Sequence, residues 1–563
     1  MSGPRAASGR GLRRAGRAVA LAAGLSLGGG ALGAGGVWLV FAAFACLAGC
    51  LEPVAAPARS SRGRKLGAMA AGGWYGAGVG LLAGLAANAV AQAWALPLLE
   101  RFGGLSLPLA LPASALLFAV QALPLTVALA IAGALVALGV SRALALPLAV
   151  PVAFTYVPAV FPWHPSAPAI RWLAWAQLAE IGGPLLLDAL LALAGVGLFW
   201  ALRGVFELLD RRAPIRHANA RRRAAAGSAL ALATLLLPAG YGWWRLPAVE
   251  AERAAAATVV AGVAQPDVTI DAGNDAARAL ARLQTLQSMT ATLEARGAAL
   301  VVWPEDAYPF GLSRGQARDT TTLPHGPNVR GALVRGPLLF GTATHGDGCD
   351  RWNSVVAMDA TGAVRGVADK VRLLAFGEYV PLWHLLPPLQ ARYACPGLRR
   401  GRAPAVLPVA GTRVGVLNCY EDVLPRFTRR LAAADPEWLF NATNDAWFRG
   451  SAEPRLHLLV ARMRSVEVRR DLVRAVNTGP SAFIDATGRV RIEAPTGRAA
   501  TFLAPVRLLA GRTPWVRFGW VYGPALGLAL LATWALAMSG AAPFKRTRLG
   551  PRRSTRSTRS TRS

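Results

Sequence analysis

The chain of 563 residues is 54% hydrophobic and has a mean hydropathy of +0.37. That composition excludes a purely soluble protein, and the length allows more than one domain. The formal net charge of +31 would suit nucleic-acid binding, but many arginines stand in short blocks between apolar runs rather than among stacking aromatic residues. We therefore expect a membrane protein with no nucleic-acid partner.

Long uncharged runs dominate the first part of the chain. Residues 66–99, 102–141 and 143–170 contain no Asp, Glu, Lys or Arg, and each run is longer than the ~20 residues that a helix needs to cross a bilayer. About eight spans of ~20 residues are predicted, near residues 18–34, 36–51, 73–97, 113–136, 143–162, 181–202, 226–246 and 518–538. Glycines between residues 28 and 36 leave the turn between the first two spans poorly defined.

A secretory signal peptide over residues 10–35 is the alternative to the first span. A signal peptide would be followed by a polar segment, whereas here another apolar run follows. Glu180 and Asp188 lie at or within the sixth span, where carboxylates are costly. We expect these two side chains to have a structural hydrogen-bonding role.

The basic blocks indicate how the spans are oriented. Loops rich in Lys and Arg stay in the cytoplasm. The blocks lie at residues 5–17, 59–65, 142, 203–223 and 545–562, which all fall on one side of the membrane if the spans are those given above. The long segment from about 247 to 516 then lies in the periplasm, because a large folded domain is translocated largely regardless of its own charge.

That long segment has the pattern of an α/β domain, with short apolar runs alternating with helical ones. Strands are expected at residues 259–263, 299–303, 337–342, 414–417, 438–441, 473–476 and 481–484, with a hairpin at 354–362. An amphipathic helix is expected at residues 275–296 and a further helix at 453–469. The last two strands are expected to close the sheet.

The predicted architecture is a multi-span α-helical membrane domain plus an α/β domain. Its parts are a basic cytoplasmic N-terminus (1–17), a membrane domain of about seven helices (18–246), a periplasmic catalytic domain (257–505), a last transmembrane helix (518–538) and a basic cytoplasmic tail (539–563). The end of the tail repeats Ser-Thr-Arg without any apolar residue to bury, so we expect it to be disordered.

Three reactive side chains stand at the ends of predicted strands. Glu305 follows the run Leu300–Trp303, Lys370 follows the hairpin, and Cys419 ends the run that begins at Val414. A thiol needs a base to remove its proton, and the oxyanion formed when it attacks a carbonyl needs a positive partner. Glu305 is the expected base, Lys370 the expected cation and Cys419 the expected nucleophile. Each also has a structural alternative: core packing for the thiol, a solvated turn for Glu305 and a surface ion pair for Lys370.

The surrounding motifs resemble those of a known family. Trp303-Pro304-Glu305, Phe376-Gly377-Glu378-Tyr379-Val380-Pro381, Cys419-Tyr420-Glu421 and Asn444-Asp445-Ala446-Trp447-Phe448 look like the blocks of the apolipoprotein N-acyltransferase family. The order Glu, Lys, Cys is similar to that of the wider nitrilase, or carbon-nitrogen hydrolase, superfamily. The resemblance covers roughly residues 257–505 and implies a nitrilase-like α-β-β-α sandwich.

The same resemblance adds Glu378, Tyr420 and Glu421 as supporting site residues. The two extra carboxylates are expected to keep Lys370 charged and in place. This chain departs from the family at one position. The family often carries a Trp shortly after the Gln-containing turn that follows its first strand. Here no Trp follows Gln265 until Trp303, so a substrate contact made by that Trp is missing or comes from elsewhere.

The remaining cysteines and histidines suggest no cofactor. The six histidines show no zinc-ligand spacing and the chain has no phosphate-binding loop motif, so no metal, nucleotide or organic cofactor is expected. Cys349 and Cys395 lie in the domain expected in the periplasm, where disulfides persist. They either form a disulfide, which leaves Cys419 as that domain's unpaired thiol, or remain free thiols.

The resemblance implies a multi-pass enzyme of the bacterial inner membrane. Cys419 would accept an acyl chain from a phospholipid as a thioester, and the N-terminal amino group of an S-diacylglyceryl-cysteine apolipoprotein would then receive it. The aromatic and apolar segment from Trp383 to Arg402 is a candidate lid at the membrane surface. A membrane-anchored amidase of the same superfamily is the first alternative, and a transporter or structural protein with a binding domain is the second.

Overall fold

The computed structural model describes residues 5–33, 36–51, 61–210, 217–269, 275–319, 327–381, 383–385, 387, 390 and 395–540. The tail that we expect to be disordered, residues 539–563, lies outside the described residues except for residues 539 and 540. The candidate lid is described only in part, and Leu385 within it is 73% exposed. The tail and the lid therefore stay predictions.

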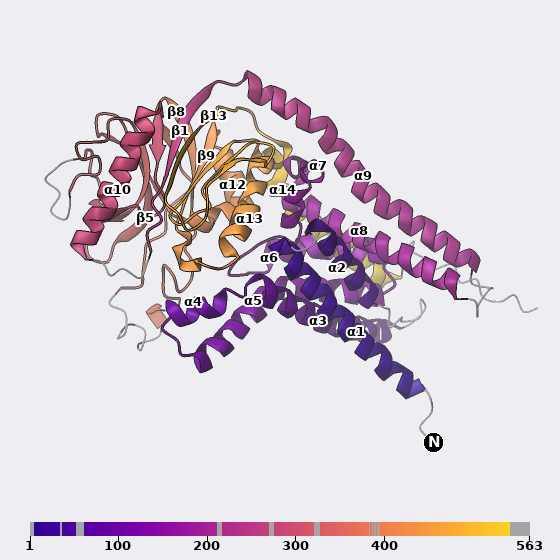
Figure 1. Ribbon diagram of the computed structural model, residues 1–563. Helices are drawn as coiled ribbons and strands as arrows, with labels where there is room; N and C mark the ends of the chain where they lie inside the picture. Colours follow the sequence, from indigo (N-terminus) through magenta and orange to yellow (C-terminus); the bar gives the residue numbers. More distant parts are fainter. Residues whose placement is uncertain are drawn as a thin grey trace, which may run out of the picture.

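The N-terminal part of the chain is a bundle of apolar helices (Figure 1). They are α1 (Arg5–Leu32), α2 (Gly36–Cys50), α3 (Arg62–Ala91), α4 (Ala95–Arg101), α5 (Leu107–Ala137), α6 (Arg142–Tyr156), α7 (Leu173–Ala176), α8 (Ala179–Leu209) and α9 (His217–Ala255), joined near the end of the chain by α14 (Pro514–Ser539). By length and composition, α3, α5, α8, α9 and α14 are long and apolar enough to cross a membrane. Shorter apolar helices cover residues 16–32, 36–50 and 142–156.

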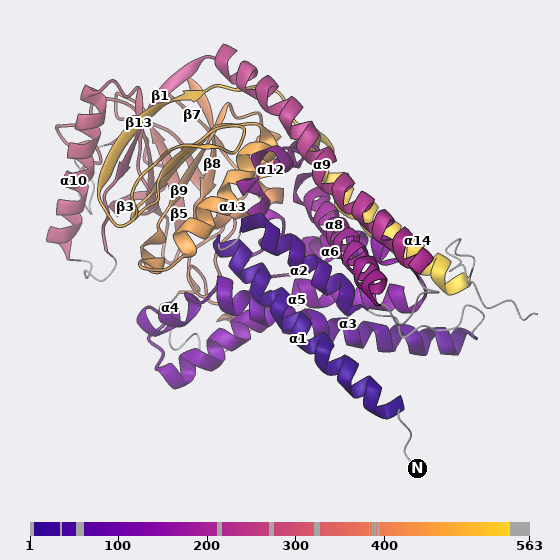
Figure 2. The same ribbon diagram turned by 45° about the vertical axis from the view of Figure 1, so that its right-hand side comes forward.

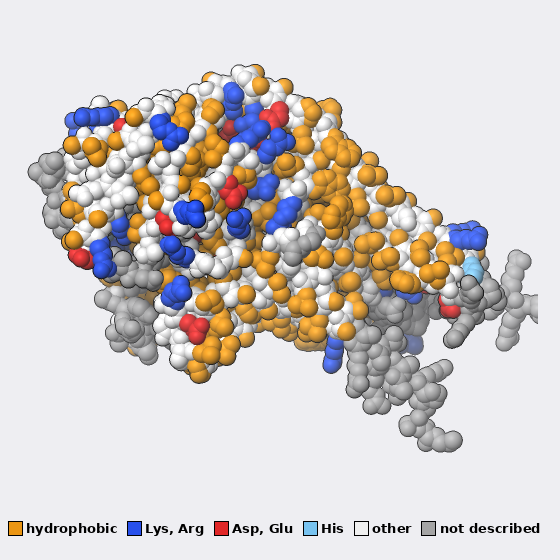
Figure 3. Space-filling view, viewed as in Figure 1, with side chains coloured by type: hydrophobic (Ala, Val, Ile, Leu, Met, Phe, Trp, Pro, Cys, Tyr) orange, Lys and Arg blue, Asp and Glu red, His pale blue; other side chains and the backbone are white. Residues whose placement is uncertain are grey.

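Each predicted span overlaps an apolar helix, and some helix bounds differ from those of the span. The helix at the third span, predicted over 73–97, runs from Arg62 to Ala91, and the separate helix α4 follows. The glycines at 28–30 lie within α1, and the chain turns only at Gly33, whose φ of 102° favours glycine. Figure 3 shows apolar surface over the helices. Leu116, Leu237 and Leu528 are among the exposed apolar residues of these helices.

Residues 258–507 form two stacked sheets. The first, in the order β13-β1-β2-β4-β5-β6 with β3 beside β4, contains β1 (Thr258–Gln265), β2 (Leu300–Val302), β3 (Tyr308–Ser313), β4 (Leu338–His345), β5 (Arg351–Met358), β6 (Val364–Asp369) and β13 (Ala500–Arg507). The second, in the order β12-β11-β10-β9-β8-β7, contains β7 (Val406–Val409), β8 (Thr412–Asn418), β9 (Trp438–Thr443), β10 (Leu472–Val476), β11 (Ala482–Ile484) and β12 (Val490–Glu493). The expectation that β10 and β11 close the sheet was wrong, because β12 extends that sheet and β13 pairs with β1 in the other.

Helices cover both outer faces, so the layers are α-β-β-α as expected (Figure 2). Apolar side chains of both sheets, among them Val263, Val355 and Phe440, form the central core. Helix α10 (Ala276–Ala295) packs Leu283 and Leu286 on the first sheet. Helices α12 (Pro425–Ala432) and α13 (Glu453–Val468) cover the second sheet through a further apolar cluster.

The chain passes between bundle and sandwich at one edge of the first sheet. Helix α9 leads directly into β1, and β13 leads into α14 (Figure 1). Strands β1 and β13 pair antiparallel from Thr258 opposite Arg507 to Gln265 opposite Ala500. Both connections therefore leave the sandwich beside each other and hold it against the helices.

Candidate active site

Glu305, Lys370 and Cys419 each follow the carboxyl end of a strand. Strands β1, β2 and β4 are parallel, whereas β5 is antiparallel to both β4 and β6. Strand β6 therefore runs in the same direction as β2, and Glu305 and Lys370 come to the same edge of the first sheet. Cys419 follows β8 of the facing sheet, and the structure brings the three side chains together between the sheets.

Cys419 occupies a tight turn at the start of η4 (Cys419–Val423). Its φ of 51° lies in the left-handed region, which non-glycine residues rarely adopt. The Asn441 side chain donates a hydrogen bond to the Cys419 carbonyl oxygen at 2.9 Å and fixes this turn from the neighbouring strand β9. Cys419 forms no disulfide and is partly buried as a residue, whereas its thiol is buried close to the charges of Glu305 and Lys370.

Lys370 lies between two carboxylates. Its Nζ donates to Glu305 Oε1 at 3.1 Å and to Glu378 Oε1 at 2.8 Å. The lysine is only 2% exposed, so the surface ion pair considered from the sequence is wrong. Asp369, the neighbour considered for that pair, instead binds Arg314. A buried ammonium with two carboxylate partners has few orientations, and this holds the positive charge beside Cys419.

Glu305 is held at both carboxylate oxygens. Glu305 Oε1 accepts hydrogen bonds from Lys370 Nζ and from Asn353 Nδ2, the latter at 2.6 Å. Glu305 Oε2 accepts one from the backbone N–H of Asn444 at 3.0 Å. Glu305 is 6% exposed, which also rules out the solvated turn considered from the sequence. The base expected from the sequence is thus an oriented, partnered carboxylate.

Asn353 connects the parts of the site and was missed from the sequence. Its Nδ2 donates to both Glu305 and Glu378, and its backbone oxygen accepts from the Lys370 N–H at 2.8 Å. Its Oδ1 accepts from the side chain of Asn418, the residue before the cysteine, at 3.1 Å. The only sequence signal was that Asn353 and Ser354 stand directly before the apolar end of β5.

The supporting residues expected from the resemblance surround this centre. Glu421 accepts hydrogen bonds from the backbone N–H groups of Val371, Arg372 and Asn418, so it ties the segment after Lys370 to the cysteine turn. The Tyr420 ring centroid lies 5.8 Å from Lys370 Nζ. Glu378 Oε2 accepts from the backbone N–H of Leu374 at 2.8 Å.

The electrostatics of the site keep the thiol protonated and the lysine charged. Burial, and then the negative charge of Glu305, raise the pKa of the Cys419 thiol well above its ordinary value. Burial by itself lowers the pKa of Lys370, but the charges of Cys419, Glu305 and Glu378 outweigh it and raise that pKa. Burial raises the pKa of Glu421 to about 7, against its backbone hydrogen bonds. Cys419 therefore depends on an adjacent base to become a nucleophile.

A buried ion-pair network supports the cysteine turn from behind. Arg474 on β10 contacts Asp422 and Asp445 and donates to Asn441 Oδ1 at 3.0 Å, the same asparagine that holds Cys419. His457 on α13 contacts Asp422 at 2.7 Å and Asp445 at 3.2 Å. Burial and the Arg474 charge lower the pKa of His457, but the two aspartates outweigh them and raise it to about 10. This network was missed from the sequence, because residues distant in the chain form its ion pairs.

Asp445, Glu453 and His457 also offer metal-ligand atoms within 4.8 Å of one another. The ligand atoms of Asp445 and His457 are already engaged with Arg474 and with each other. Two adjacent cationic side chains disfavour a metal ion electrostatically. We therefore interpret the group as part of the ion-pair network.

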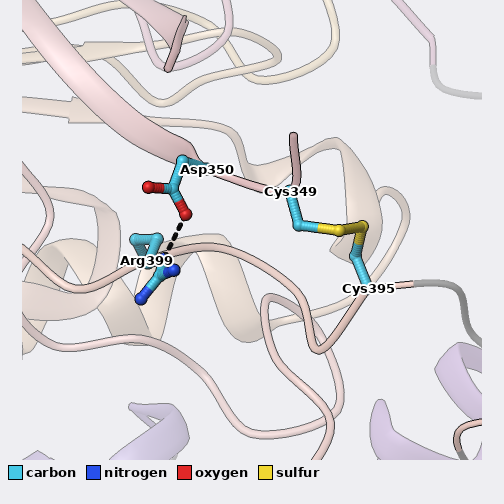
Figure 4. Close-up of a disulfide and its surroundings, with 4 residues drawn as sticks. All are labelled: Cys349, Asp350, Cys395 and Arg399. Carbon is cyan, nitrogen blue, oxygen red and sulfur yellow. Dashed lines mark hydrogen bonds and ion pairs between the residues drawn. A yellow bond between two sulfur atoms is a disulfide. The ribbon is translucent and has the colours of Figure 1, made fainter. Parts of the chain in front are cut away.

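A disulfide joins Cys349 and Cys395, which settles the alternative left open by the sequence (Figure 4). Cys349 directly precedes β5, the strand that carries Asn353, and Cys395 lies after the segment that carries Glu378. Beside the disulfide, Asp350 pairs with Arg399 at 2.5 Å (Figure 4). Both links tie the segment after Glu378 back to the first sheet.

Comparisons with known proteins found a matching family model, similar sequences and similar solved structures. The model of the carbon-nitrogen hydrolase family matches residues 261–510. An apolipoprotein N-acyltransferase of Geobacter metallireducens is 31% identical over 388 residues, which cover 67% of this chain and 70% of that protein. One of Pseudomonas putida is 30% identical over 65% of this chain and 69% of its own length. Among solved structures, an amidase from Nesterenkonia sp. aligns over 46% of this chain and 92% of its own, with 17% identity and a TM-score of 0.33.

Proposed function

The chain belongs to the apolipoprotein N-acyltransferase family, and from this premise we propose that Glu305, Lys370 and Cys419 carry out its acyl transfer. The enzyme transfers an acyl chain from a lipid donor to a lipoprotein. The observation that supports the assignment of residues is the buried Lys370, held between Glu305 and Glu378 close to the free thiol of Cys419. Glu378, Tyr420 and Glu421 support these three residues in the proposal.

The first half-reaction loads the cysteine. Glu305 takes the thiol proton as Cys419 Sγ attacks the ester carbonyl carbon of a phospholipid, typically at the sn-1 chain of phosphatidylethanolamine. Lys370 stabilises the negative charge that develops on the carbonyl oxygen. When the tetrahedral intermediate collapses, the C–O bond breaks, the lysophospholipid leaves with the proton from Glu305, and a thioester remains on Cys419.

The second half-reaction consumes the thioester. The α-amino group of an S-diacylglyceryl-cysteine apolipoprotein attacks the thioester carbonyl and loses a proton to Glu305. Lys370 again stabilises the oxyanion. Collapse breaks the C–S bond, the thiolate recovers the proton, and the amide-linked acyl chain leaves with the lipoprotein.

The site is proposed to lie on the periplasmic side of the bacterial inner membrane. The basic blocks between the apolar runs support this orientation, because Lys- and Arg-rich loops stay cytoplasmic. The division into a basic N-terminus (1–17), a membrane domain (18–246), a catalytic domain (257–505), a last span (518–538) and a tail (539–563) is part of the same proposal. The two adjacent connections at β1 and β13 support a sandwich held close to the bilayer.

Cys419→Ala tests the proposal. The purified full-length protein is incubated with a phospholipid that carries a labelled acyl chain and with a diacylated lipopeptide. We expect the wild type and Cys46→Ala, which removes a free cysteine outside the site, to form a labelled acyl-enzyme and the N-acylated peptide. Cys419→Ala should form neither. Transfer that survives in Cys419→Ala would refute the assignment, and release of free fatty acid without peptide acylation would indicate a hydrolase.

A further inference from the structure

Three arginines on α12 lack an acidic partner. Arg426, Arg429 and Arg430 lie within five residues of one helix, and among the described residues none of the three forms a salt bridge or side-chain hydrogen bond. Arg426 and Arg430 are exposed, whereas Arg429 is half-buried and its Nε atom is buried without a partner. Three like charges at this spacing repel one another unless an anion lies between them.

Two of these arginines, Arg426 and Arg429, lie against helix α14. Gly519 and Gly523 are buried and lie four residues apart, so they share a face of α14. A Cβ atom at Gly519 would lie 2.8 Å from Arg429 Cδ, and one at Gly523 would lie 3.4 Å from an Arg426 guanidinium nitrogen. The two glycines thus leave the space in which the arginine side chains lie against the helix. Figure 1 shows α12 beside α14 at the boundary between sandwich and bundle.

Aromatic rings complete the surroundings. The Arg426 guanidinium lies 5.1 Å from the ring centroid of Tyr156, at the end of α6, and that of Arg429 lies 5.8 Å from the ring of Trp515. These rings orient the guanidinium groups but do not neutralise them. Burial, followed by the charges of Arg426 and Arg430, lowers the pKa of Arg429, as expected for a cation without a counterion.

The position of the group along α14 identifies the missing anion. Phe518 and Trp520, in the first turns of this apolar helix, are 55% and 65% exposed, and Leu528 and Leu531 continue the exposed apolar surface. Exposed aromatic residues at the end of an apolar helix are typical of the membrane–water interface. If α14 crosses the bilayer, the arginines lie at the level of the lipid headgroups, where phosphate groups are concentrated.

We propose that Arg426, Arg429 and Arg430 bind the phosphate of a membrane-lipid headgroup where α12 meets the first turns of α14 and the end of α6, a place we call the arginine site. Guanidinium groups suit this ligand because they can donate two hydrogen bonds to one phosphate. The acyl chains of the lipid lie along the exposed apolar face of α14. This lipid is distinct from the acyl donor, and it fastens the catalytic domain to the outer end of the last helix.

The test compares Arg426→Gln/Arg429→Gln with Arg278→Gln/Arg296→Gln. The control pair removes the same charge from the exposed surface of α10 and its C-terminal end, on the far side of the sandwich. Full-length proteins in detergent are given dioleoylphosphatidylglycerol, dioleoylglycerol or inorganic phosphate, and retained ligands are counted by native mass spectrometry. We expect the wild type and the control to retain one more phosphatidylglycerol molecule than Arg426→Gln/Arg429→Gln. The affinity of that variant for phosphatidylglycerol should fall about tenfold or more.

Each outcome decides the proposal. The proposal would be overturned if the wild type, the control and the Gln variant retained equal amounts of phosphatidylglycerol. It would also be overturned if the wild type retained dioleoylglycerol, which has the same acyl chains but no phosphate, as well as it retains phosphatidylglycerol. If millimolar inorganic phosphate displaced the lipid, the arginine site would bind a free anion rather than a lipid, which would also overturn the proposal. Arg426→Lys/Arg429→Lys keeps the charge but cannot donate two hydrogen bonds from one side chain in the same way. It should therefore retain less phosphatidylglycerol than the wild type and more than the Gln variant, and this intermediate result would exclude a folding defect as the cause.

Discussion

At the scale of single residues, the site depends on side chains that hold the reactive groups in place. Asn353 donates to Glu305 Oε1 at 2.6 Å and to Glu378 Oε1 at 3.0 Å. We expect Asn353→Ala to lower kcat by about 10- to 100-fold, because two hydrogen bonds to charged groups are lost. The KM for the phospholipid should change little, since Asn353 is buried behind the reacting groups.

The matched control is Asn328→Ala, which removes an asparagine that caps a turn at Gly331. Its kcat should equal that of the wild type. An Asn353→Ala enzyme with unchanged kcat, or with a raised KM as its main defect, would contradict a positioning role. Asn353→Asp should be at least as impaired as the Ala variant, because it adds a third carboxylate beside Glu305 and Glu378 and removes the donor.

The pH dependence of cysteine alkylation reports the charges around Cys419. The raised pKa of this thiol means that alkylation by iodoacetamide should accelerate only at strongly alkaline pH. Glu305 raises that pKa and Lys370 lowers it. Glu305→Gln should therefore shift the alkylation profile to lower pH although it abolishes acyl transfer, and Lys370→Met should shift it to higher pH. Shifts in the same direction for both variants would contradict this electrostatic account.

At the scale of elements, the network between α13, β10 and η4 should make stability depend on pH. The folded-state pKa of His457, about 10, lies above its ordinary value of 6.5. The native state therefore binds this proton more tightly than the unfolded state. The resulting stabilisation, on the order of a few kcal/mol, is fully present below pH 6.5 and is lost as the pH rises through 10.

His457→Gln provides the comparison for this linkage. In detergent, the wild-type Tm should fall steadily between pH 7 and pH 10. The variant should be less stable than the wild type at pH 7 and should show a flatter decline, because it has no proton to lose. His384→Gln, on the exposed η3 (Trp383–Leu385), serves as the control and should follow the wild-type curve. Parallel curves for wild type and His457→Gln would exclude the network as the source of the slope.

The disulfide between Cys349 and Cys395 should stabilise the segment that carries Glu378. It closes a loop with a sequence separation of 46 residues, and its loss removes about 2–4 kcal/mol on the chain-entropy account. Cys349→Ser/Cys395→Ser should therefore lower the Tm, and dithiothreitol should lower the Tm of the wild type but not of this variant. Cys46→Ser should behave as the wild type in both conditions, and a reductant effect that persists in the double variant would point to another cause.

The sequence predicted those elements whose signals are local. Short apolar runs located β1, β4, β8 and β9, and an amphipathic pattern located α10, whose cap residue Asp275 accepts a hydrogen bond from the Ala277 N–H. Strand β13 was missed because its residues are mostly half-exposed and its pairing with β1 spans the whole domain. Asn353 and Arg474 were missed for a similar reason, since their partners are distant in sequence and only the folded sheets bring them together.

At the scale of the whole molecule, the site depends on how the sandwich is fixed to the helices. Glu180 on α8 accepts a hydrogen bond from Arg469, the C-cap residue directly after α13, at 2.8 Å. It also accepts from Tyr241 at 2.6 Å and from Arg245 at 2.9 Å, both on α9. Glu180 is 4% exposed, so the hydrogen-bonding role expected from the sequence agrees with its contacts. One carboxylate thus joins two helices of the bundle to the helix that supports the cysteine turn.

Removal of Glu180 should therefore loosen the whole assembly. Glu180→Ala leaves the buried Arg469 guanidinium without its carboxylate partner, a loss that costs about 3–5 kcal/mol when a buried pair is broken. Glu252→Ala removes the exposed carboxylate that also binds Arg245 and should cost less than about 1 kcal/mol. We expect Glu180→Ala to lower the Tm of the full-length protein, to expose the junctions near Ala255 and Pro514 to protease, and to lower acyl transfer to a lipopeptide. Equal Tm values and equal cleavage in the two variants would show that the sandwich is held to the helices by apolar packing alone.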